Sequence, residues 1–309
     1  MSKKVFIIGN GFDLDLGMNT RYSDFAKSDK WPLVVSHSNT LSKHLQDKAH
    51  LEKWFDLEKE LLSYAGLRGK TKVQWYKNIA DTNKKYFNSL VSSLTEYIKE
   101  EEKKPINKDS IAAKVFRAII ENGAFSSIYS FNYTDLHEIA RKLGITQKFN
   151  YEHVHGSIKN DNIILGVEDK SDLIAGYQFM YKTYSPHYES HPIQYDLLEA
   201  DEVVFFGHSL GHNDYHYFQM FFLMQCQENM NRKDGKRITI FTYDDASRIQ
   251  ILEQLRSMND RKMDLLFNLN QLQVICTKDG ESMRFRRFLE ELKERGEGLN
   301  NFVLNQLLG

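Results

Sequence analysis

The residues that decide the fold are Lys3-Lys4-Val5-Phe6-Ile7-Ile8, followed at once by Gly9-Asn10-Gly11. This short apolar run predicts a strand over Lys4–Ile8 that is buried on both faces of a parallel sheet. A glycine-rich turn between such a strand and a helix brings backbone N–H groups close to a phosphate in many α/β folds. The sequence therefore predicts a nucleotide-binding turn, with a helix-like stretch after Gly17. A purely structural turn is the alternative.

Six further apolar runs bounded by turn residues predict strands, and strand and helix alternate from residue 126 onward. The expected strands are Ser127–Phe131, Tyr151–His155, Ile163–Leu165, Glu202–Phe206, Arg237–Tyr243 and Leu272–Cys276. The expected helices are 108–122, 134–143, 193–200, 214–230, 246–257 and 281–297. This alternation predicts an α/β fold with a Rossmann-like, doubly wound parallel sheet.

The long segment between the first two predicted strands contains no strand-like run. Its apolar residues recur with helical spacing over residues 38–66 and 73–103. We therefore expect a helical insertion at residues 35–122 within a single domain that spans residues 1–309. The insertion is compatible with a lid over the site and with an oligomer contact.

The composition restricts the possible partners. The chain has 309 residues, 41 Lys and Arg, 42 Asp and Glu, and a net charge of −1. Such a balance gives no attraction to nucleic acid or to an anionic membrane. We expect a cytoplasmic protein because no apolar run resembles a signal peptide or approaches the ~18 residues of a membrane span. Cys226 and Cys276 are too few for a four-thiolate zinc module, and no metal is expected.

Polar side chains follow most of the predicted strands. Ligands of an open α/β sheet bind beyond the carboxyl ends of its strands, so these residues are candidates for one site. The segments are Gly9–Asp13, Ser130–Asp135, His153–Ser157, Gly207–Asp214 and Thr242–Asp245.

Four of these segments resemble the sirtuin motifs, and they occur in the sirtuin order. Gly9–Asp13 with Gly17–Phe25 is similar to the sirtuin opening, and Phe131-Asn132-Tyr133-Thr134 is similar to Gln-Asn-Ile-Asp. His155-Gly156 matches His-Gly, and Gly207–Leu210 matches Gly-Thr-Ser-Leu. Within that superfamily the chain most resembles the AbiH family of phage abortive-infection proteins, over about residues 3–245.

The resemblance implies an NAD site with two catalytic residues. Asn132 would orient the nicotinamide ribose or the attacking water, and His155 would be the general base. The glycine turn would hold the pyrophosphate, Ser209 would contact phosphate or ribose, and Asp244 would lie near the adenine ribose. The implied cofactor-binding residues are Gly9, Asn10, Gly11, Phe12, Asp13, Gly207, Ser209 and Asp244.

The departures from the sirtuin pattern narrow the implied activity. The chain lacks the four cysteines of the deacetylase zinc module, and Ala26 stands where the sirtuin opening has an arginine. The resemblance therefore implies hydrolysis of NAD to nicotinamide and ADP-ribose in antiphage defence, with NAD as substrate. A homo-oligomer and a phage-derived trigger are compatible with it.

Two other functions remain open at this stage. The first is a sensor, in which the same pocket would bind NAD or ADP-ribose without catalysing a reaction. The second is a nucleic-acid-directed effector, which the near-neutral net charge disfavours. Individual residues also have structural explanations. Asn132 is a candidate N-cap for the helix at 134–143, and His155 is a candidate buried histidine without a catalytic role. His153 is a candidate supporting residue.

Overall fold

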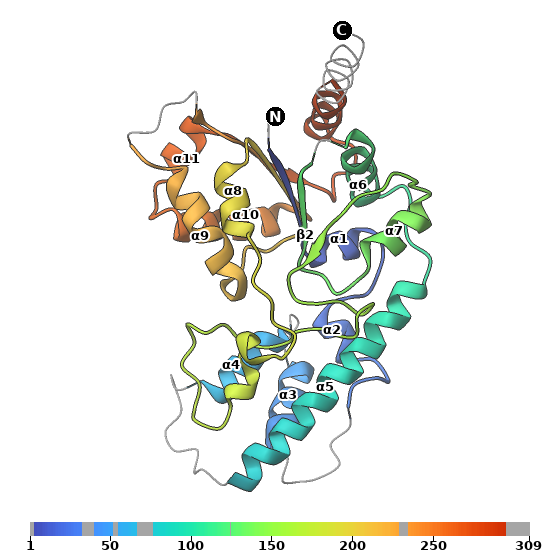
Figure 1. The fold of residues 1–309 in the computed structure, drawn as a ribbon, viewed down its shortest axis with the longest axis vertical. Coiled ribbons are helices and arrows are strands. Elements are labelled where there is room, and N and C mark those ends of the chain that lie inside the picture. Colours follow the sequence, from blue (N-terminus) through green and yellow to red (C-terminus); the bar gives the residue numbers. More distant parts are fainter. Residues whose placement is uncertain are drawn as a thin grey trace. The chain divides into compact units, whose positions relative to one another are not determined.

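The computed structural model describes residues 3–32, 40–51, 55–66, 77–123, 125–228 and 234–294 (Figure 1). The chain divides into two compact units. The first, here called the sheet unit, comprises residues 1–18, 105–154 and 191–309. The second, the helical unit, comprises residues 19–104 and 155–190. Each unit is described by itself.

The sheet unit contains a six-stranded sheet in which every pair of neighbours is parallel. Its strand order is β3-β2-β1-β4-β5-β6, the order of the Rossmann fold. Successive strands are added to one side of β1 up to β3 and to its other side from β4 onward. The position between β1 and β4 is therefore the topological switch point, where such folds bind ligands. The strands are β1 (Lys4–Ile8), β2 (Ser127–Ser130), β3 (Glu152–His153), β4 (Glu202–Phe206), β5 (Arg237–Thr242) and β6 (Gln271–Cys276).

Helices cover both faces of the sheet, which confirms the predicted doubly wound α/β fold. Phe6 and Ile8 of β1 face a core formed with α1 (Asn10–Asp15), α6 (Ile111–Asn122) and α7 (Leu136–Leu143). Val5 and Ile7 face the opposite core, because successive strand residues point to opposite faces. That core contains α8 (Ile193–Glu199), α9 (Tyr215–Met224), α10 (Asp245–Met258) and α11 (Met263–Leu269).

The strand predictions are confirmed except at Ile163–Leu165, where the structure has no strand. These three residues are 3–5% exposed, so the apolar run reflects burial in the helical unit. Two short helices also differ from expectation. The first helix, α1, begins directly after Gly9, and α11 follows α10 without having been predicted.

The helical unit contains α2 (Tyr22–Phe25), α3 (Thr40–Leu51), α4 (Leu57–Ala65), α5 (Lys77–Lys103) and the short turns η1 (Gln178–Met180) and η2 (Lys182–Tyr184). The fully buried Asn83 joins its parts. Its amide donates to the hydroxyls of Tyr64 at 2.9 Å and Tyr177 at 2.7 Å, and its oxygen accepts from the Leu41 N–H at 3.2 Å.

The boundaries of this unit differ from the expected insertion at 35–122. The helix α6 groups with the sheet because Ile111, Val115 and Phe116 pack into its core. Residues 155–190 group instead with the helices. The predicted helix 38–66 is two helices, since Asp56 caps α4 by accepting from the Lys59 N–H at 3.1 Å. Residues 38–39, 52–54, 73–76, 229–230 and 295–297 of the predicted helices lie outside the described residues.

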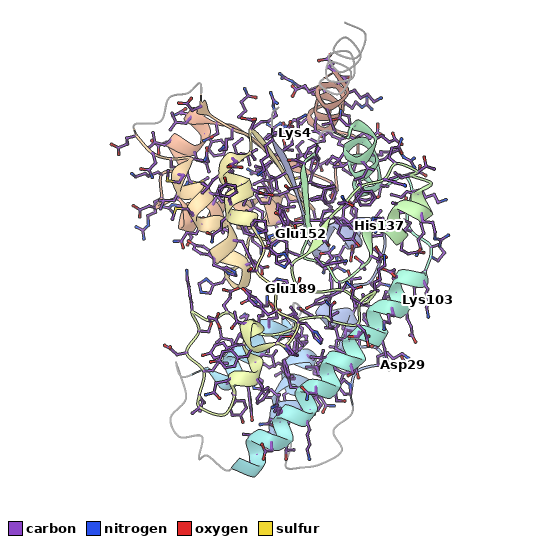
Figure 2. The ribbon with its side chains drawn as sticks, in the orientation of Figure 1. Lys4, Asp29, Lys103, His137, Glu152 and Glu189 are labelled. Carbon is purple, nitrogen blue, oxygen red and sulfur yellow. The ribbon has the colours of Figure 1, made fainter. Side chains whose placement is uncertain are left out.

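A buried ion pair lies at the amino ends of the two central strands, β1 and β4. Lys4 of β1, labelled in Figure 2, lies 3.5 Å from the carboxylate of Glu202 on β4. Both side chains are buried, and the Arg237 guanidinium lies 3.8 Å from the same carboxylate. Within the described ranges, no helix is both long and apolar enough to cross a membrane.

Candidate functional site at the carboxyl ends of the strands

The turns after β1 and β4 pack backbone against backbone at the switch point. The Gly9 N–H donates to the Phe206 carbonyl, and the Gly11 N–H donates to the Gly207 carbonyl, both at 2.9 Å. A Cβ on Gly9 would lie 2.5 Å from the Cα of His208. A Cβ on Gly11 would lie 2.6 Å from the Cα of Gly207. Gly207 has φ +65°, and a Cβ there would lie 2.4 Å from the Gly11 carbonyl carbon. The close approach of these two turns therefore requires glycine at all three positions.

Phe12 and Asn10, two other residues of the predicted glycine turn, differ in the exposure of their side chains. Phe12 is fully buried and packs edge-on against Phe116 and Phe206, each with ring centroids 5.5 Å apart. Its side chain belongs to the core, so only its backbone is available to a ligand. Asn10 is exposed, and it begins α1 with no side-chain cap at Gly9.

Asp13 and Asn132 form a buried hydrogen-bonded pair that links α1 to the end of β2. The Asn132 amide nitrogen donates to the Asp13 carboxylate at 2.8 Å and to the Gly9 carbonyl at 3.1 Å. The Thr134 hydroxyl also donates to Asp13, at 3.0 Å. Asp13 is 1% exposed, Asn132 is 5% exposed and Thr134 is fully buried. Two predicted site residues are thus brought into direct contact.

The structure removes the simplest structural explanation for Asn132. The cap of α7 is Asp135, whose carboxylate accepts from the His137 N–H at 2.9 Å. The Asn132 side-chain oxygen has no hydrogen-bond partner among the described residues, although the atom is buried. A buried acceptor without a partner costs about 1–3 kcal/mol, and native proteins keep few of them. This oxygen marks a position that a donor group from a ligand or a water would satisfy.

Two residues of the following segment contact the loop that carries Asn132. His153 Nδ1 lies 3.1 Å from the Asn132 carbonyl oxygen, which requires a proton on that nitrogen. The Tyr151 hydroxyl donates to Asp135 at 2.6 Å and accepts from the Leu136 N–H at 3.1 Å. His153 of β3 and Tyr151 just before it therefore hold the loop that carries Asn132.

The turn after β4 presents His208 and Ser209 differently. His208 is 4% exposed, and its Nδ1 accepts from the Leu210 N–H at 2.9 Å. The ring proton is then on Nε2, which lies 3.5 Å from the Asp214 carboxylate. The Ser209 side chain is exposed, and its hydroxyl oxygen accepts from the Gly211 N–H at 3.2 Å.

Asp244 follows β5 and is the N-cap of α10. Its carboxylate accepts from the backbone N–H of Ser247 at 3.0 Å and from the Ser247 hydroxyl at 2.9 Å. These hydrogen bonds lower the pKa of the Asp244 carboxyl. The residue is half-buried, and a contact with an adenine ribose stays a prediction.

His155 belongs to the helical unit, whereas Asn132 belongs to the sheet unit. His155 is 7% exposed, and its Nε2 lies 3.4 Å from the Lys182 ammonium. The same ammonium lies 3.2 Å from the Glu58 carboxylate, and all three side chains are buried. Gly156, next in the chain, has φ +71°, and a Cβ there would lie 2.0 Å from the Asn162 carbonyl oxygen. Glycine is therefore required beside His155.

Sequence reasoning missed the partners of both predicted catalytic residues. Asp13 was expected to contact the cofactor, and nothing in its spacing indicated Asn132 as its partner. Glu58 lies in α4 and Lys182 in the short turn η2, each without a motif that sets it apart. No group of three or more His, Cys, Asp or Glu side chains in the described part of the chain is arranged to hold a metal ion.

Fold and site together define an α/β protein of Rossmann topology with a polar site at its topological switch point. The model of one protein family, bacteriophage abortive infection AbiH, matches residues 5–232, and the chain belongs to this family.

Solved structures of Sir2 proteins are similar over most of their length, at low scores. A structure of a Sir2 homologue with NAD is 12% identical, with a TM-score of 0.38, and covers 87% of this chain and 91% of its own. A structure from a study of the mechanism and regulation of Sir2 enzymes is 12% identical, with a TM-score of 0.35, and covers 85% of this chain and 94% of its own. No curated protein matches the sequence.

Proposed function

We propose that this AbiH-family protein is an abortive-infection effector that binds NAD at the switch point of its sheet and hydrolyses it to nicotinamide and ADP-ribose. The observation that carries the proposal is the Asn132 side chain, fixed by Asp13 and Gly9 with a buried oxygen left unsatisfied. Asn132 lies just after β2, and β2 is the neighbour of β1 in the sheet. The turn that follows β1 contacts the turn that follows β4.

The chemistry requires a held substrate, a water and a base. Water attacks C1′ of the nicotinamide ribose as the bond from C1′ to the nicotinamide nitrogen breaks, and the water proton passes to the base. A histidine suits this role because its ordinary pKa is near neutrality. In this proposal Asn132 orients the ribose or the water, and His155 is the general base. Gly9, Asn10, Gly11, Phe12, Asp13, Gly207, Ser209 and Asp244 are the proposed cofactor-site residues.

The test measures, by chromatography, the nicotinamide that the purified full chain releases from NAD. Asn132→Ala and His155→Ala are expected to abolish release. Asn160→Ala and His187→Ala, at exposed positions of the helical unit, are the matched controls and should release nicotinamide at the wild-type rate. Equal release by Asn132→Ala and the wild type would contradict the assignment.

A wild type that binds NAD in calorimetry and releases no nicotinamide would instead favour the sensor function. Absence of binding would contradict both functions. Tight binding of RNA or DNA in moderate salt would support a nucleic-acid-directed effector.

A further inference from the structure

The Asn132 amide has a fixed polarity in the sheet unit. Its nitrogen carries two hydrogens, and two acceptors take them: the Gly9 carbonyl at 3.1 Å and the Asp13 carboxylate at 2.8 Å. The nitrogen therefore has no hydrogen left for a ligand. The oxygen remains as the one polar atom of this side chain without a partner in the described residues.

Asp13 is the residue that sets this polarity. Exchanging the oxygen and nitrogen of Asn132 would place its oxygen against a carboxylate and a carbonyl, two groups that only accept. Asp13 is 1% exposed, so burial confines its carboxylate beside Asn132. It also accepts from the Thr134 hydroxyl at 3.0 Å. One buried carboxylate thereby determines which end of a neighbouring amide a ligand meets.

We propose that Asp13 is a positioning residue that acts through Asn132, and that the Asn132 oxygen accepts a hydrogen bond from a ligand hydroxyl. A phosphate oxygen or a carboxylate would meet a second acceptor here, so this position selects against them. The identification of the hydroxyl as that of the ribose beyond the pyrophosphate rests on the proposed function. The positioning role of Asp13 does not depend on it.

The first measurement is hydrogen exchange of the Asn132 side-chain amide in the full chain, by nuclear magnetic resonance on asparagine-labelled protein. The resonance is assigned as the one missing from Asn132→Ser. Slow exchange is expected in the wild type and fast exchange in Asp13→Ala. Thr134→Val is the matched control, because it removes a hydrogen bond to Asp13 without touching Asn132, and it should keep slow exchange. Persistent slow exchange in a folded Asp13→Ala would overturn the positioning role.

Asp13→Asn is the second variant in case Asp13→Ala does not fold. It removes the charge and keeps the shape, so the exchange of the Asn132 amide should be at least threefold faster than in the wild type. An unchanged exchange rate in Asp13→Asn would then overturn the proposal.

The second measurement is calorimetric binding of ADP-ribose and of ADP, which lacks the terminal ribose. Asp13→Ala, or Asp13→Asn if that is the folded variant, is expected to weaken ADP-ribose binding about tenfold more than it weakens ADP binding. Equal weakening of both ligands would overturn recognition of the ribose hydroxyl. A wild type that binds neither ligand would overturn the NAD-site proposal and the ribose assignment, while the exchange measurement still decides the role of Asp13.

Discussion

Gly11 and Gly207 meet without side chains between them: the Gly11 N–H donates to the Gly207 carbonyl at 2.9 Å, and each occupies the space of the other's absent Cβ. This contact joins the turns after β1 and β4, which flank the switch point of the sheet. Stability and site geometry therefore depend on the same few backbone atoms.

Gly207→Ala is expected to destabilise the sheet unit strongly. The left-handed backbone at φ +65° costs about 1–2 kcal/mol for alanine, and the clash with Gly11 adds about 1–3 kcal/mol. Gly144→Ala is the control, since Gly144 has φ +73° but a Cβ added there would meet no atom within 4 Å. It should show only the backbone cost. Urea unfolding of both variants measures the difference, and equal losses would show that the contact between the turns is unimportant.

Substitutions of Lys182 and Glu58, a buried ion pair of the helical unit, are expected to have strongly coupled effects on the free energy of unfolding. Both side chains are at most 10% exposed, and removing one partner of such a pair typically costs about 3–5 kcal/mol. Lys182→Met and Glu58→Gln should each lower the free energy of unfolding, and the double variant should lose less than the sum of the two. A double-mutant cycle from urea unfolding measures this coupling.

Strict additivity in that cycle would contradict the coupling. The Lys99–Asp161 pair, whose side chains are 42% and 74% exposed, offers a control cycle at the surface of the same unit. A pair of this kind typically contributes about 0.2–1 kcal/mol, so its variants should be close to the wild type in stability.

Asp196 is expected to make the sheet unit sensitive to acid. Burial alone would raise the pKa of its carboxyl, but hydrogen bonds from Lys3, Ser127 and Tyr129 outweigh burial and lower it. A carboxyl whose folded pKa is lowered stabilises the fold above its ordinary value of 3.8, and this contribution disappears as the pH falls through the folded pKa.

Asp196→Asn should therefore lower the free energy of unfolding by about 1–3 kcal/mol at pH 7. The gap from the wild type should narrow below pH ~4, since the wild-type carboxylate then takes up its proton. Asp234→Asn, at an exposed position of the same unit, is the control and should follow the wild type at every pH. A gap that stays constant down to pH ~2 would contradict the role of the carboxylate charge.

The sequence by itself determined the sheet and the candidate strand ends. Apolar runs such as Lys4–Ile8 and Glu202–Phe206 are strands with the predicted bounds, because burial on both faces leaves a continuous apolar signal. Parallel pairing followed from the alternation with helices. The run Ile163–Leu165 shows the limit of this signal, since burial outside a sheet produces the same pattern.

Only the tertiary structure decided which of the candidate residues meet. Asp13 and Asn132 are 119 positions apart, and Lys182 lies far along the chain from Glu58. Periodicity reports local backbone geometry and burial, whereas these contacts exist because the packing of distant segments closes long loops of chain. The grouping of residues 155–190 with the helices is of the same kind. The sequence identified candidate residues at the strand ends, and the fold determined which partners they contact.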